Sequence, residues 1–351
     1  MLKSFFSSLS RDLGIDLGTC SILVYVKDKG IVIDEPSVVA LNTRTDQILA
    51  VGKDAQKMIG KTPHYIEAIK PLDRGIISDF EVTEKMLKYF VERIDRGTFG
   101  FMIRPRVVIG IPLDVTEVER KAVEDAVVAA GAREVFLVEK LMAAAIGARL
   151  PVQEPNASMV VDFGGGTTEI AVISLGGIVS WKSLHIAGND LNNDIIQYAR
   201  NEFNILLGEK VAEQVKIKIG SAIAETGEQM ELRVRGRDLI SGLPKEIIMT
   251  DGQIREALAR SIRIIIDNIK ATLEVTPPEL VSDIYERGMV LTGGGALLKG
   301  IDKAIAKATQ IPVQIADDPI TCTVRGTGII IETFDTLSAI VLPSTQQESA
   351  L

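Results

Sequence analysis

Two short segments combine a carboxylate with glycine and threonine. The first to consider runs Asp162-Phe-Gly-Gly-Gly-Thr-Thr168 and follows an apolar run that begins at Met159. Three consecutive glycines are costly in a strand, so they indicate a turn whose bare backbone approaches a ligand. Backbone N–H groups and the hydroxyls of Thr167 and Thr168 suit a phosphate, and a carboxylate suits its Mg²⁺, usually through water. An ordinary glycine-rich hairpin is the alternative interpretation.

The same arrangement stands near the N-terminus. The segment Asp16-Leu-Gly-Thr19 lies between an apolar start at Leu13 and an apolar run at 22–26. Both copies predict a strand, an Asp-x-Gly turn with threonine, a second strand, a glycine turn and a third strand. An internal repeat of this kind predicts two similar halves that grip a phosphate chain from both sides.

Further elements must position these turns. Apolar runs predict strands at 107–111, 134–138 and 288–292, and alternation predicts strands at 230–234 and 247–249. Apolar spacing and capping residues predict helices at 53–59, 83–94 with Thr83 as N-cap, 116–130 with Thr116 and Glu119 as a capping box, 142–148, 191–203 and 253–273. We expect Gly293 to Gly295 to open a further helix, whose N-terminus would suit an anion.

Composition narrows the class of protein. The 351 residues suffice for two domains, and the net charge of −8 argues against nucleic acid as a partner. The two cysteines, Cys20 and Cys322, provide neither a disulfide framework nor a four-cysteine metal site, which favours a reducing cytoplasm. We find no apolar stretch of the roughly 20 residues that span a bilayer, and no secretory signal.

Two apolar segments predict interfaces: the first predicts contact with a membrane surface, and the family resemblance described below implies the same for the second. Met1, Leu2, Phe5, Phe6 and Leu9 share one face at helical spacing. Phe99, Phe101 and Met102 lie in a loop between two arginines, and exposed apolar clusters usually mark an interface. A frayed or docked terminus and a buried loop anchor are the respective alternatives.

The motifs together resemble a known superfamily. The paired Asp-x-Gly-x-Thr hairpins and the later turn Thr292-Gly-Gly-Gly-Ala296 are similar to those of the ATPases that include actin, heat-shock chaperones and sugar kinases. Within that superfamily, segments 35–40, 59–63, 104–112 and 277–283 resemble the family of the bacterial actin homologue MreB. The resemblance covers nearly the whole chain.

The resemblance implies an α/β, actin-like fold: two similar ribonuclease-H-like domains around a nucleotide cleft, each with a small inserted subdomain. Domain I would comprise residues 1–32 and 67–141, with its insertion at 33–66. Domain II would comprise 142–186 and 250–342, with its insertion at 187–249 and the last helix a candidate to return to domain I. Residues 343–351 would form a disordered tail.

The implied cofactors are ATP and Mg²⁺, with Asp16 and Asp162 near the metal through water. The residues expected at the nucleotide are Asp16, Gly18, Thr19, Cys20, Asp162, Gly164, Gly165, Gly166, Glu213, Lys216, Gly293, Gly294, Gly295 and Ala296. Thr167 would orient the attacking water. For Glu213 and Lys216, a solvated helix face is the alternative.

One position departs from the family pattern. Where the family has a second glutamate that polarises the attacking water, this sequence has Lys140, preceded by Glu139. A protonated lysine cannot accept a proton from water unless its pKa is strongly lowered. Either Glu139 takes over, or the protein binds nucleotide and hydrolyses it slowly; the second interpretation is slightly favoured.

The resemblance implies a filament-forming, membrane-associated bacterial cytoskeletal protein that directs cell-wall synthesis and rod shape. Its partners would be itself in paired protofilaments, the membrane surface and proteins of the cell-wall elongation machinery. It would lie in the cytoplasm, on the inner face of the cell membrane. The alternative is a sugar- or acetate-type kinase of the same superfamily.

Overall fold

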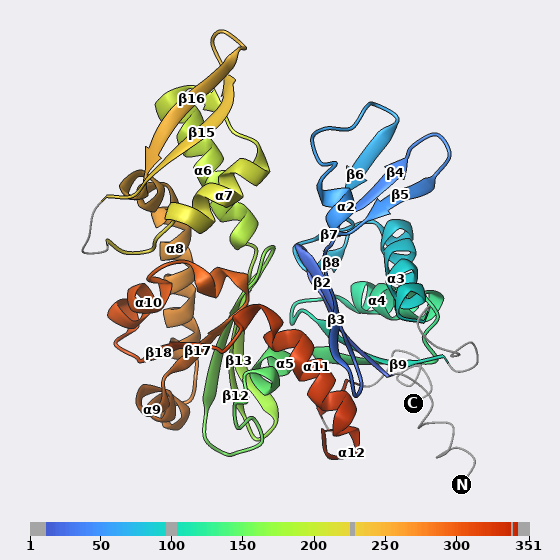
Figure 1. Cartoon of the computed structure of the whole chain (residues 1–351). Coiled ribbons are helices and arrows are strands. Elements are labelled where there is room, and N and C mark those ends of the chain that lie inside the picture. The colour runs from blue at the N-terminus through green and yellow to red at the C-terminus, as the bar shows by residue number, and fades with distance from the viewer. Residues whose placement is uncertain (1–11, 96–103, 225–228, 338–339, 343–351) are drawn as a thin grey trace. The chain divides into compact units, whose positions relative to one another are not determined.

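The computed structural model describes residues 12–95, 104–224, 229–337 and 340–342 (Figure 1). The chain forms two compact units, each described here by itself. Unit 1 comprises Met1–Gln153 and Thr321–Leu351, and unit 2 comprises Glu154–Ile320. The expected membrane residues Met1, Leu2, Phe5, Phe6, Leu9, Phe99, Phe101 and Met102, and the tail 343–351, lie outside the described residues.

Unit 1 is built on a five-stranded sheet in the order β10-β9-β1-β2-β3. Its strands are β1 (Leu13–Leu17), β2 (Ser21–Val26), β3 (Gly30–Pro36), β9 (Arg106–Ile111) and β10 (Glu134–Glu139). The first three form the antiparallel hairpins expected from the repeat, whereas β9 and β10 run parallel to β1. The carboxyl ends of β1, β9 and β10 therefore meet at one edge.

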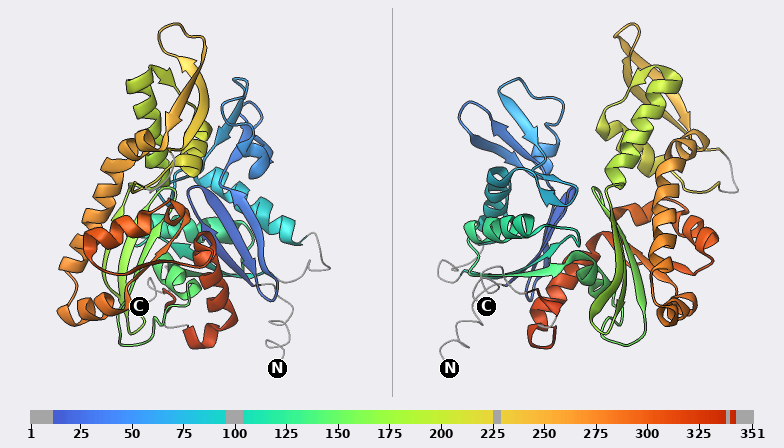
Figure 2. Two further views of the ribbon diagram at one scale, coloured as in Figure 1. Left: turned by 60° about the vertical axis from the view of Figure 1, so that its left-hand side comes forward. Right: turned by 180° about the vertical axis from the view of Figure 1, so that it is seen from behind.

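Helices cover both faces of this sheet (Figures 1 and 2). They are α3 (Phe80–Asp95), α4 (Glu117–Ala129), α5 (Lys140–Gly147), α11 (Cys322–Glu332) and the short α12 (Phe334–Leu337). Leu13, Ile15 and Leu17 share a core with apolar residues of α3 and α4. Side chains alternate between faces along a strand, so Gly14 and Asp16 face the other side. There α11 lies so close that a Cβ on Gly14 would stand 2.5 Å from Oγ1 of Thr327.

Small sheets complete unit 1. The inserted sheet has the order β5-β4-β6, and a two-stranded hairpin pairs β7 with β8. The elements are β4 (Val39–Asn42), β5 (Gln47–Val51), β6 (Ile66–Ile69), β7 (Leu72–Asp73), β8 (Ile76–Ile77) and α2 (Lys53–Gln56). Helix α2 is shorter than the expected 53–59. Its Ala55 packs with Val38 and Ala40 in a small separate core.

Unit 2 repeats the arrangement. Its main sheet has the order β13-β12-β11-β17-β18, with β11, β12 and β13 antiparallel and β17 and β18 parallel to β11. The strands are β11 (Ser158–Phe163), β12 (Thr168–Ser174), β13 (Gly177–Leu184), β17 (Met289–Thr292) and β18 (Val313–Ile315). Each corresponds in order and direction to β1, β2, β3, β9 and β10, which confirms the duplication predicted from the sequence.

The helices of unit 2 form one core with its sheet. They are α6 (Gly188–Phe203), α7 (Glu209–Ile219), α8 (Asp251–Glu274), α9 (Pro278–Arg287), α10 (Ile301–Thr309), and the 3₁₀ turns η1 (Gly294–Leu297) and η2 (Pro319–Thr321). A three-stranded sheet adds β14 (Ile205–Leu206), β15 (Glu231–Asp238) and β16 (Pro244–Thr250). None of the helices in the described ranges is long and apolar enough to cross a membrane.

Two sequence predictions about element ends require correction. The expected cap Thr83 lies inside α3, and Asp79 instead accepts a hydrogen bond from the N–H of Val82 at 3.0 Å. Gly293 to Gly295 do not open an α-helix: they lead into η1, and α10 begins only at Ile301. The capping box predicted at Thr116 is confirmed, and the structure shows a second one at Thr250.

The boundary between the units also differs from the expected one. Helix α5, which the sequence placed in domain II, belongs to unit 1. It packs against α11 without side chains between them, because a Cβ on Gly147 would stand 1.8 Å from the carbonyl oxygen of Cys322. Helix α11 thus returns to unit 1, as the sequence allowed for the last helix.

Candidate functional site

The first Asp-x-Gly turn joins β1 to β2 at the carboxyl edge of the unit 1 sheet. Gly18 donates its N–H to the carbonyl oxygen of Ser21 at 3.0 Å, and its own carbonyl accepts from Oγ of Ser37 at 2.6 Å. A Cβ on Gly18 would stand 2.8 Å from that Ser21 oxygen. The turn is therefore tight enough to require glycine, and Ser37 fixes its orientation.

Thr19 and Cys20 complete this turn. The hydroxyl of Thr19, which is 7% exposed, accepts a hydrogen bond from the N–H of Gly75 at 2.8 Å. The N–H of Ser37 donates to the carbonyl oxygen of Cys20 at 3.1 Å, while the Cys20 residue itself is exposed. The turn is thus held from two sides by the chain, and Cys20 is its accessible member.

Asp16 and Lys140, which the sequence assigned to metal binding and to the catalytic position, face each other in unit 1. The ammonium Nζ of Lys140 lies 3.8 Å from Oδ1 of Asp16, and the two side chains are 13% and 9% exposed. At this distance they form an ion pair without a direct hydrogen bond. Lys140 is therefore a charge partner of the first turn, and its position next to Asp16 gives it no role as a base.

Gly110 lies next to this ion pair. In the sheet register Gly110 of β9 lies beside Asp16 on one side and Val138 of β10 on the other. A Cβ on Gly110 would stand 3.6 Å from Cα of Lys140 and 3.8 Å from its Cβ. These are ordinary van der Waals distances, so Lys140 packs directly against β9 at the level of Asp16.

Glu139 ends β10 and directly precedes Lys140. Burial raises the pKa of the Glu139 carboxyl above its ordinary value. A carboxylate with a raised pKa is a better proton acceptor than an exposed one. Glu139 thus has the electrostatic character that a water-activating base needs.

The second Asp-x-Gly turn lies at the carboxyl edge of the unit 2 sheet. Asp162 is 2% exposed and accepts a hydrogen bond at Oδ1 from the hydroxyl of Thr292 at 2.8 Å. The two residues are direct neighbours in the parallel pairing of β11 with β17. The strand beside Asp162 therefore holds its carboxylate in place.

The glycines after Asp162 are fastened to the start of α6. The N–H of Gly188 donates to the carbonyl oxygen of Gly164 at 3.1 Å, and the N–H of Asn189 to that of Gly165 at 2.8 Å. In a trans peptide the C=O and N–H bonds point in opposite directions. The N–H groups of Gly165 and Gly166 are therefore turned away from α6, as a phosphate-binding turn requires.

The two threonines of this turn differ in whether their hydroxyls can donate a hydrogen bond to a ligand. Thr168 donates its hydroxyl to the carbonyl oxygen of Ile186 at 2.7 Å, so it cannot donate the same hydrogen to a phosphate, contrary to the sequence expectation. Thr167 is 3% exposed, and its carbonyl accepts from the N–H of Gly164 at 2.9 Å. Its proposed role with water stays a prediction.

The late glycine turn, Gly293 to Ala296, has a packing reason for two of its glycines. A Cβ on Gly293, whose φ is +77°, would stand 2.4 Å from the carbonyl oxygen of Phe163, and one on Gly295 would stand 2.2 Å from the Phe163 ring. Gly294 is exposed and has no such restriction, since its nearest neighbour would be Ile320 at 4.0 Å. Of the three, Gly294 has the free space for a ligand.

Glu213 and Lys216, the two charged residues expected at the nucleotide, have different surroundings on α7. Lys216 donates from Nζ to the carbonyl oxygen of Gly188 at 2.6 Å, so it supports the start of α6 and, through it, the second turn. Glu213 is exposed on the same helix. Lys216 is therefore connected to the second Asp-x-Gly turn through Gly188.

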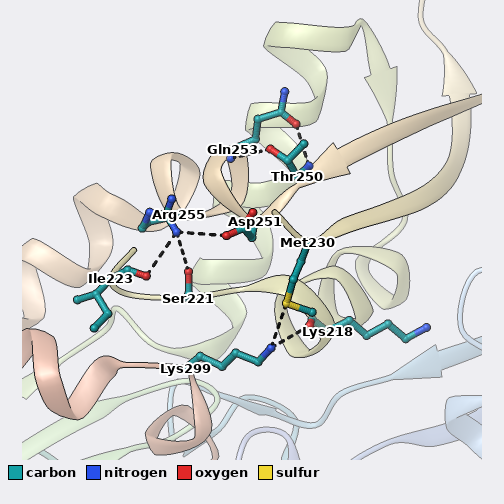
Figure 3. A network of polar contacts seen from close by, with 9 residues as sticks. All are labelled: Lys218, Ser221, Ile223, Met230, Thr250, Asp251, Gln253, Arg255 and Lys299. Carbon is teal, nitrogen blue, oxygen red and sulfur yellow. Dashed lines mark hydrogen bonds and ion pairs between the residues drawn. The ribbon is translucent and has the colours of Figure 1, made fainter. Parts of the chain in front are cut away.

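The end of α7 is joined to the late glycine turn. Figure 3 shows Arg255 of α8 donating from Nη1 to Oγ of Ser221 at 3.2 Å and to the carbonyl oxygen of Ile223 at 3.4 Å. The N–H of Ala222 donates to the carbonyl oxygen of Lys299 at 2.8 Å. The segment that follows α7 is thus hydrogen-bonded to α8 and to Lys299, which follows the late glycine turn.

Sequence reasoning missed several residues of these turns. Gly110 and Ser37 lie in quoted segments but were not predicted as site residues; strand register brings Gly110 to Asp16, and a hydrogen bond connects Ser37 to Gly18. Thr292 was part of a quoted motif, but its contact with Asp162 was not foreseen. Glu169 is fully buried and lies opposite Asp162 in the antiparallel register. A glutamate within an otherwise apolar strand was the available signal for it.

Both turns are suited to a phosphate, but their two aspartates are not equally suited to a metal ion. Across the described part of the chain no group of three or more His, Cys, Asp or Glu side chains could hold a metal ion. A magnesium ion would therefore be held largely through phosphate oxygens and water, as Mg²⁺ commonly is. Asp162 is fixed by a neutral donor, which suits that role, whereas Asp16 already faces an ammonium.

The repeated sheets and turns define an actin-like fold, and the comparisons with known structures agree. MreB5 of Spiroplasma citri, in crystal structures bound to ADP and to AMPPNP, superposes with a TM-score of 0.89 at 38% identity, over 94% of this chain and 98% of that chain.

The family follows from the sequence comparisons. The family model of the MreB/Mbl proteins matches residues 10–339. The chain is 49% identical to the cell shape-determining protein MreB of Escherichia coli, over 95% of this chain and 97% of the relative. It is 46% identical to the cell shape-determining protein Mbl of Bacillus cereus, over 93% and 98%. The chain belongs to the MreB/Mbl family, and the family predicted from the sequence is confirmed.

Proposed function

We propose that this chain is a nucleotide-dependent, filament-forming cytoskeletal protein that determines cell shape. The observation that carries the proposal is the pair of Asp-x-Gly turns at equivalent strand ends of two duplicated units. Relatives at 46% and 49% identity are named cell shape-determining proteins, and the similar MreB5 structures contain adenine nucleotides. This family membership favours a cytoskeletal protein over a sugar or acetate kinase.

The nucleotide is proposed to be ATP with Mg²⁺. The backbone of Gly18 and Thr19 and that of Gly164 to Gly166 would hold phosphates, and Asp162 would hold water of the metal. The metal supplies charge that offsets the phosphate oxygens. The chain itself supplies fixed turns, because Ser37 and the start of α6 hold the carbonyl oxygens of both.

Electron microscopy and sedimentation with ATP test this proposal. Asp162→Ala removes the carboxylate that Thr292 positions, and we expect it to abolish nucleotide-dependent filaments. Asp125→Ala is the matched control, since Asp125 pairs with Lys121 on the surface of α4. Normal filaments and unchanged ATP affinity in Asp162→Ala would contradict the role of the turn. A kinase would instead release ADP only when an acceptor substrate is added, and would give no sedimentable polymer.

Hydrolysis is proposed to be slow. Lys140 stands at the family's catalytic position but faces Asp16, so the remaining candidate base is Glu139. General-base assistance is typically worth about 10²–10⁴-fold in rate. Lys140→Glu should therefore raise phosphate release and shorten filament lifetime, whereas Glu139→Ala should change little. If Glu139→Ala removes a robust ATPase activity and Lys140→Glu has no effect, Glu139 is the base and hydrolysis is not impaired.

Membrane association and guidance of cell-wall synthesis are also proposed, from the apolar residues near the N-terminus and at 99–102. Deletion of residues 1–9 together with Phe99, Phe101 and Met102→Ser should abolish co-sedimentation with liposomes and preserve polymerisation. The control replaces Leu239, Ile240 and Leu243, three exposed apolar residues in unit 2, with serine. Liposome binding that survives the combined change would refute the anchor.

A further inference from the structure

The small sheet of unit 2, β14-β15-β16, has one face in the core and one face towards solvent. Alternate residues of its two longer strands contribute to the core of the unit or pack against it: Leu232, Val234, Ile247 and Met249. Helix α7 contacts β15 and helix α8 contacts β16 (Figures 1 and 2). Side chains alternate along a strand, so the residues between point to the other face. We call it the arginine face, and it comprises Arg233, Arg235, Arg237, Glu246, Ile248 and Leu206.

Three arginines form a row on this face. Arg233, Arg235 and Arg237 occupy alternate positions of β15, and all three are exposed. Alternate residues of a strand are about 7 Å apart, so the outer two arginines are separated by about 14 Å. Arginine is enriched at interfaces between proteins, whereas lysine is depleted there. The row therefore has the composition of a contact surface for another protein.

The middle arginine is neutralised within the sheet, and the outer two are not. Arg235 donates from Nε to Oε2 of Glu246, its cross-strand neighbour, at 2.7 Å. Within the described part of the chain, the side chains of Arg233 and Arg237 make neither a hydrogen bond nor an ion pair. The arginine face thus presents two separate guanidinium groups with a neutral pair between them.

Each of the outer arginines lies beside an exposed apolar side chain. In the antiparallel register Arg233 is opposite Ile248 of β16, and Arg237 is opposite Leu206 of β14. Residues that are directly opposite point to the same face, with their Cβ atoms about 5 Å apart. Ile248 is 47% exposed and Leu206 is 37% exposed. A guanidinium with an aliphatic neighbour suits a partner that combines carboxylates with apolar side chains, which a polypeptide does and a phosphate chain does not.

Hydrogen bonds hold this face in a fixed shape. Lys245 donates from Nζ to the carbonyl oxygen of Phe203 at 2.8 Å and pairs with Asp238 at 3.0 Å. The same aspartate accepts from the N–H of Ser241 at 2.8 Å, at the end of the hairpin. A surface that is already ordered loses little conformational freedom when it binds, which favours affinity.

We propose that the arginine face of unit 2 binds an acidic and apolar segment of another protein in extended conformation, with carboxylates four residues apart on Arg233 and Arg237. Positions i and i+4 of an extended segment lie on one side about 14 Å apart, which matches the two arginines. A guanidinium binds a carboxylate through two parallel hydrogen bonds. Apolar residues of the segment would cover Ile248 and Leu206. The net charge of −8 disfavours nucleic acid as the occupant.

Fluorescence anisotropy with a defined peptide tests the proposal. The probe is a fluorescein-labelled peptide of three Glu-Ser-Leu-Ser repeats, which in extended form alternates carboxylate and apolar groups along one side. It is titrated into the full chain without nucleotide. We expect Arg233→Gln with Arg237→Gln to weaken binding at least about tenfold, because both guanidinium contacts are lost. The same peptide with glutamine in place of glutamate should bind the unaltered protein equally weakly.

Two controls separate the outer arginines from charge in general. Arg235→Gln with Glu246→Gln removes the neutral pair from the same face and should change the dissociation constant by less than about threefold. Arg263→Gln with Lys303→Gln removes two exposed positive charges from α8 and α10 and should bind as the unaltered protein does. All six side chains are exposed, so every variant should fold, and circular dichroism checks this.

Four results would overturn the inference. The first is a dissociation constant of the unaltered protein for the glutamate peptide above about 1 mM. The second is equal weakening in the Arg233 and Arg237 variant and in either control. The third is an oligothymidine that binds as tightly as the peptide and is weakened by the same variant, since the face would then recognise any negative charge. The fourth is loss of ATP-dependent sedimentation in that variant, which would assign the face to a contact between copies of this chain.

Discussion

The two units place an aspartate at the same strand end and hold it by different means. In unit 2 the residue beside Asp162 on the next strand is Thr292, whose hydroxyl donates to the carboxylate at 2.8 Å. In unit 1 the equivalent residue beside Asp16 is Gly110. The ammonium Nζ of Lys140 lies 3.8 Å from Oδ1 of Asp16. The partner of the duplicated aspartate thus differs between the units: a hydroxyl for Asp162 and an ammonium for Asp16.

The largest effect on stability is expected from Lys140→Gln. Removing Lys140 takes a charge partner from the largely buried Asp16 carboxylate, which should cost about 3 kcal/mol of unfolding free energy. Urea denaturation followed by circular dichroism measures the loss. Asp16→Asn should recover part of it when combined with Lys140→Gln, and a double variant no more stable than the single one would show that the pair is not coupled.

A smaller loss is expected in unit 2 from Thr292→Val, which keeps the shape of the side chain and removes its hydroxyl. Leaving the buried Asp162 carboxylate without this donor should cost about 2 kcal/mol. The single tryptophan, Trp181, lies on β13 of unit 2, so its fluorescence during urea denaturation reports on this unit. Thr292→Ser retains the hydroxyl and should lose much less. Equal losses in both variants would mean that the methyl group matters and the hydrogen bond does not.

Gly110→Ser should make unit 1 more like unit 2. The added Cβ would stand 3.4 Å from Cγ2 of Thr323, which is van der Waals contact, so we expect a loss of stability below about 1 kcal/mol. The new hydroxyl beside Asp16 should weaken the coupling energy between Asp16 and Lys140 in a double-mutant cycle. Gly110→Ala adds the same Cβ without a hydroxyl and is the control. A coupling energy reduced equally by both variants would indicate that space alone is responsible.

The smallest effect concerns pH and Glu139. Burial raises the pKa of this carboxyl above its ordinary value of 4.5, so the folded state binds its proton more tightly than the unfolded state. Its stabilising contribution is then complete below the unfolded pKa and is lost as pH rises through the folded pKa. Glu139→Gln should therefore gain stability relative to the unaltered protein as pH increases from acid to neutral. Glu134→Gln, on the exposed start of the same strand, is the control and should show no such trend.

Much of the fold could be predicted because short local sequence patterns indicate the repeated strands and turns. Apolar runs, the Asp-x-Gly turns and the second glycine turns marked both three-stranded meanders, and a capping box marked the start of one helix. Local signals also produced the errors. Thr83 was a good N-cap type, but Asp79 stands one turn earlier and caps the helix instead.

The details of the site depend on strand register, which the sequence does not state. The partnership of Asp16 with Lys140 requires β9 to lie between β1 and β10 with Gly110 at the level of Asp16. The glycines at 293 and 295 suggested backbone bared for a ligand, whereas the ring and carbonyl of Phe163 restrict both positions. Close packing between distant segments thus explains why Gly293 and Gly295 are glycines. Strand register, in turn, brings Gly110 next to Asp16.

The return of α11 to unit 1 has a consequence for biosynthesis. Unit 2 is continuous from Glu154 to Ile320, whereas unit 1 needs the segment that starts at Thr321. Until Cys322 to Glu332 have been translated, the sheet face at Gly14 and the close-packed surface of α5 at Gly147 lack their cover. Domains generally fold as units during synthesis, so the second half of this chain should reach its native state before the first. A nascent chain halted before Cys322 would present that open apolar face to chaperones and proteases.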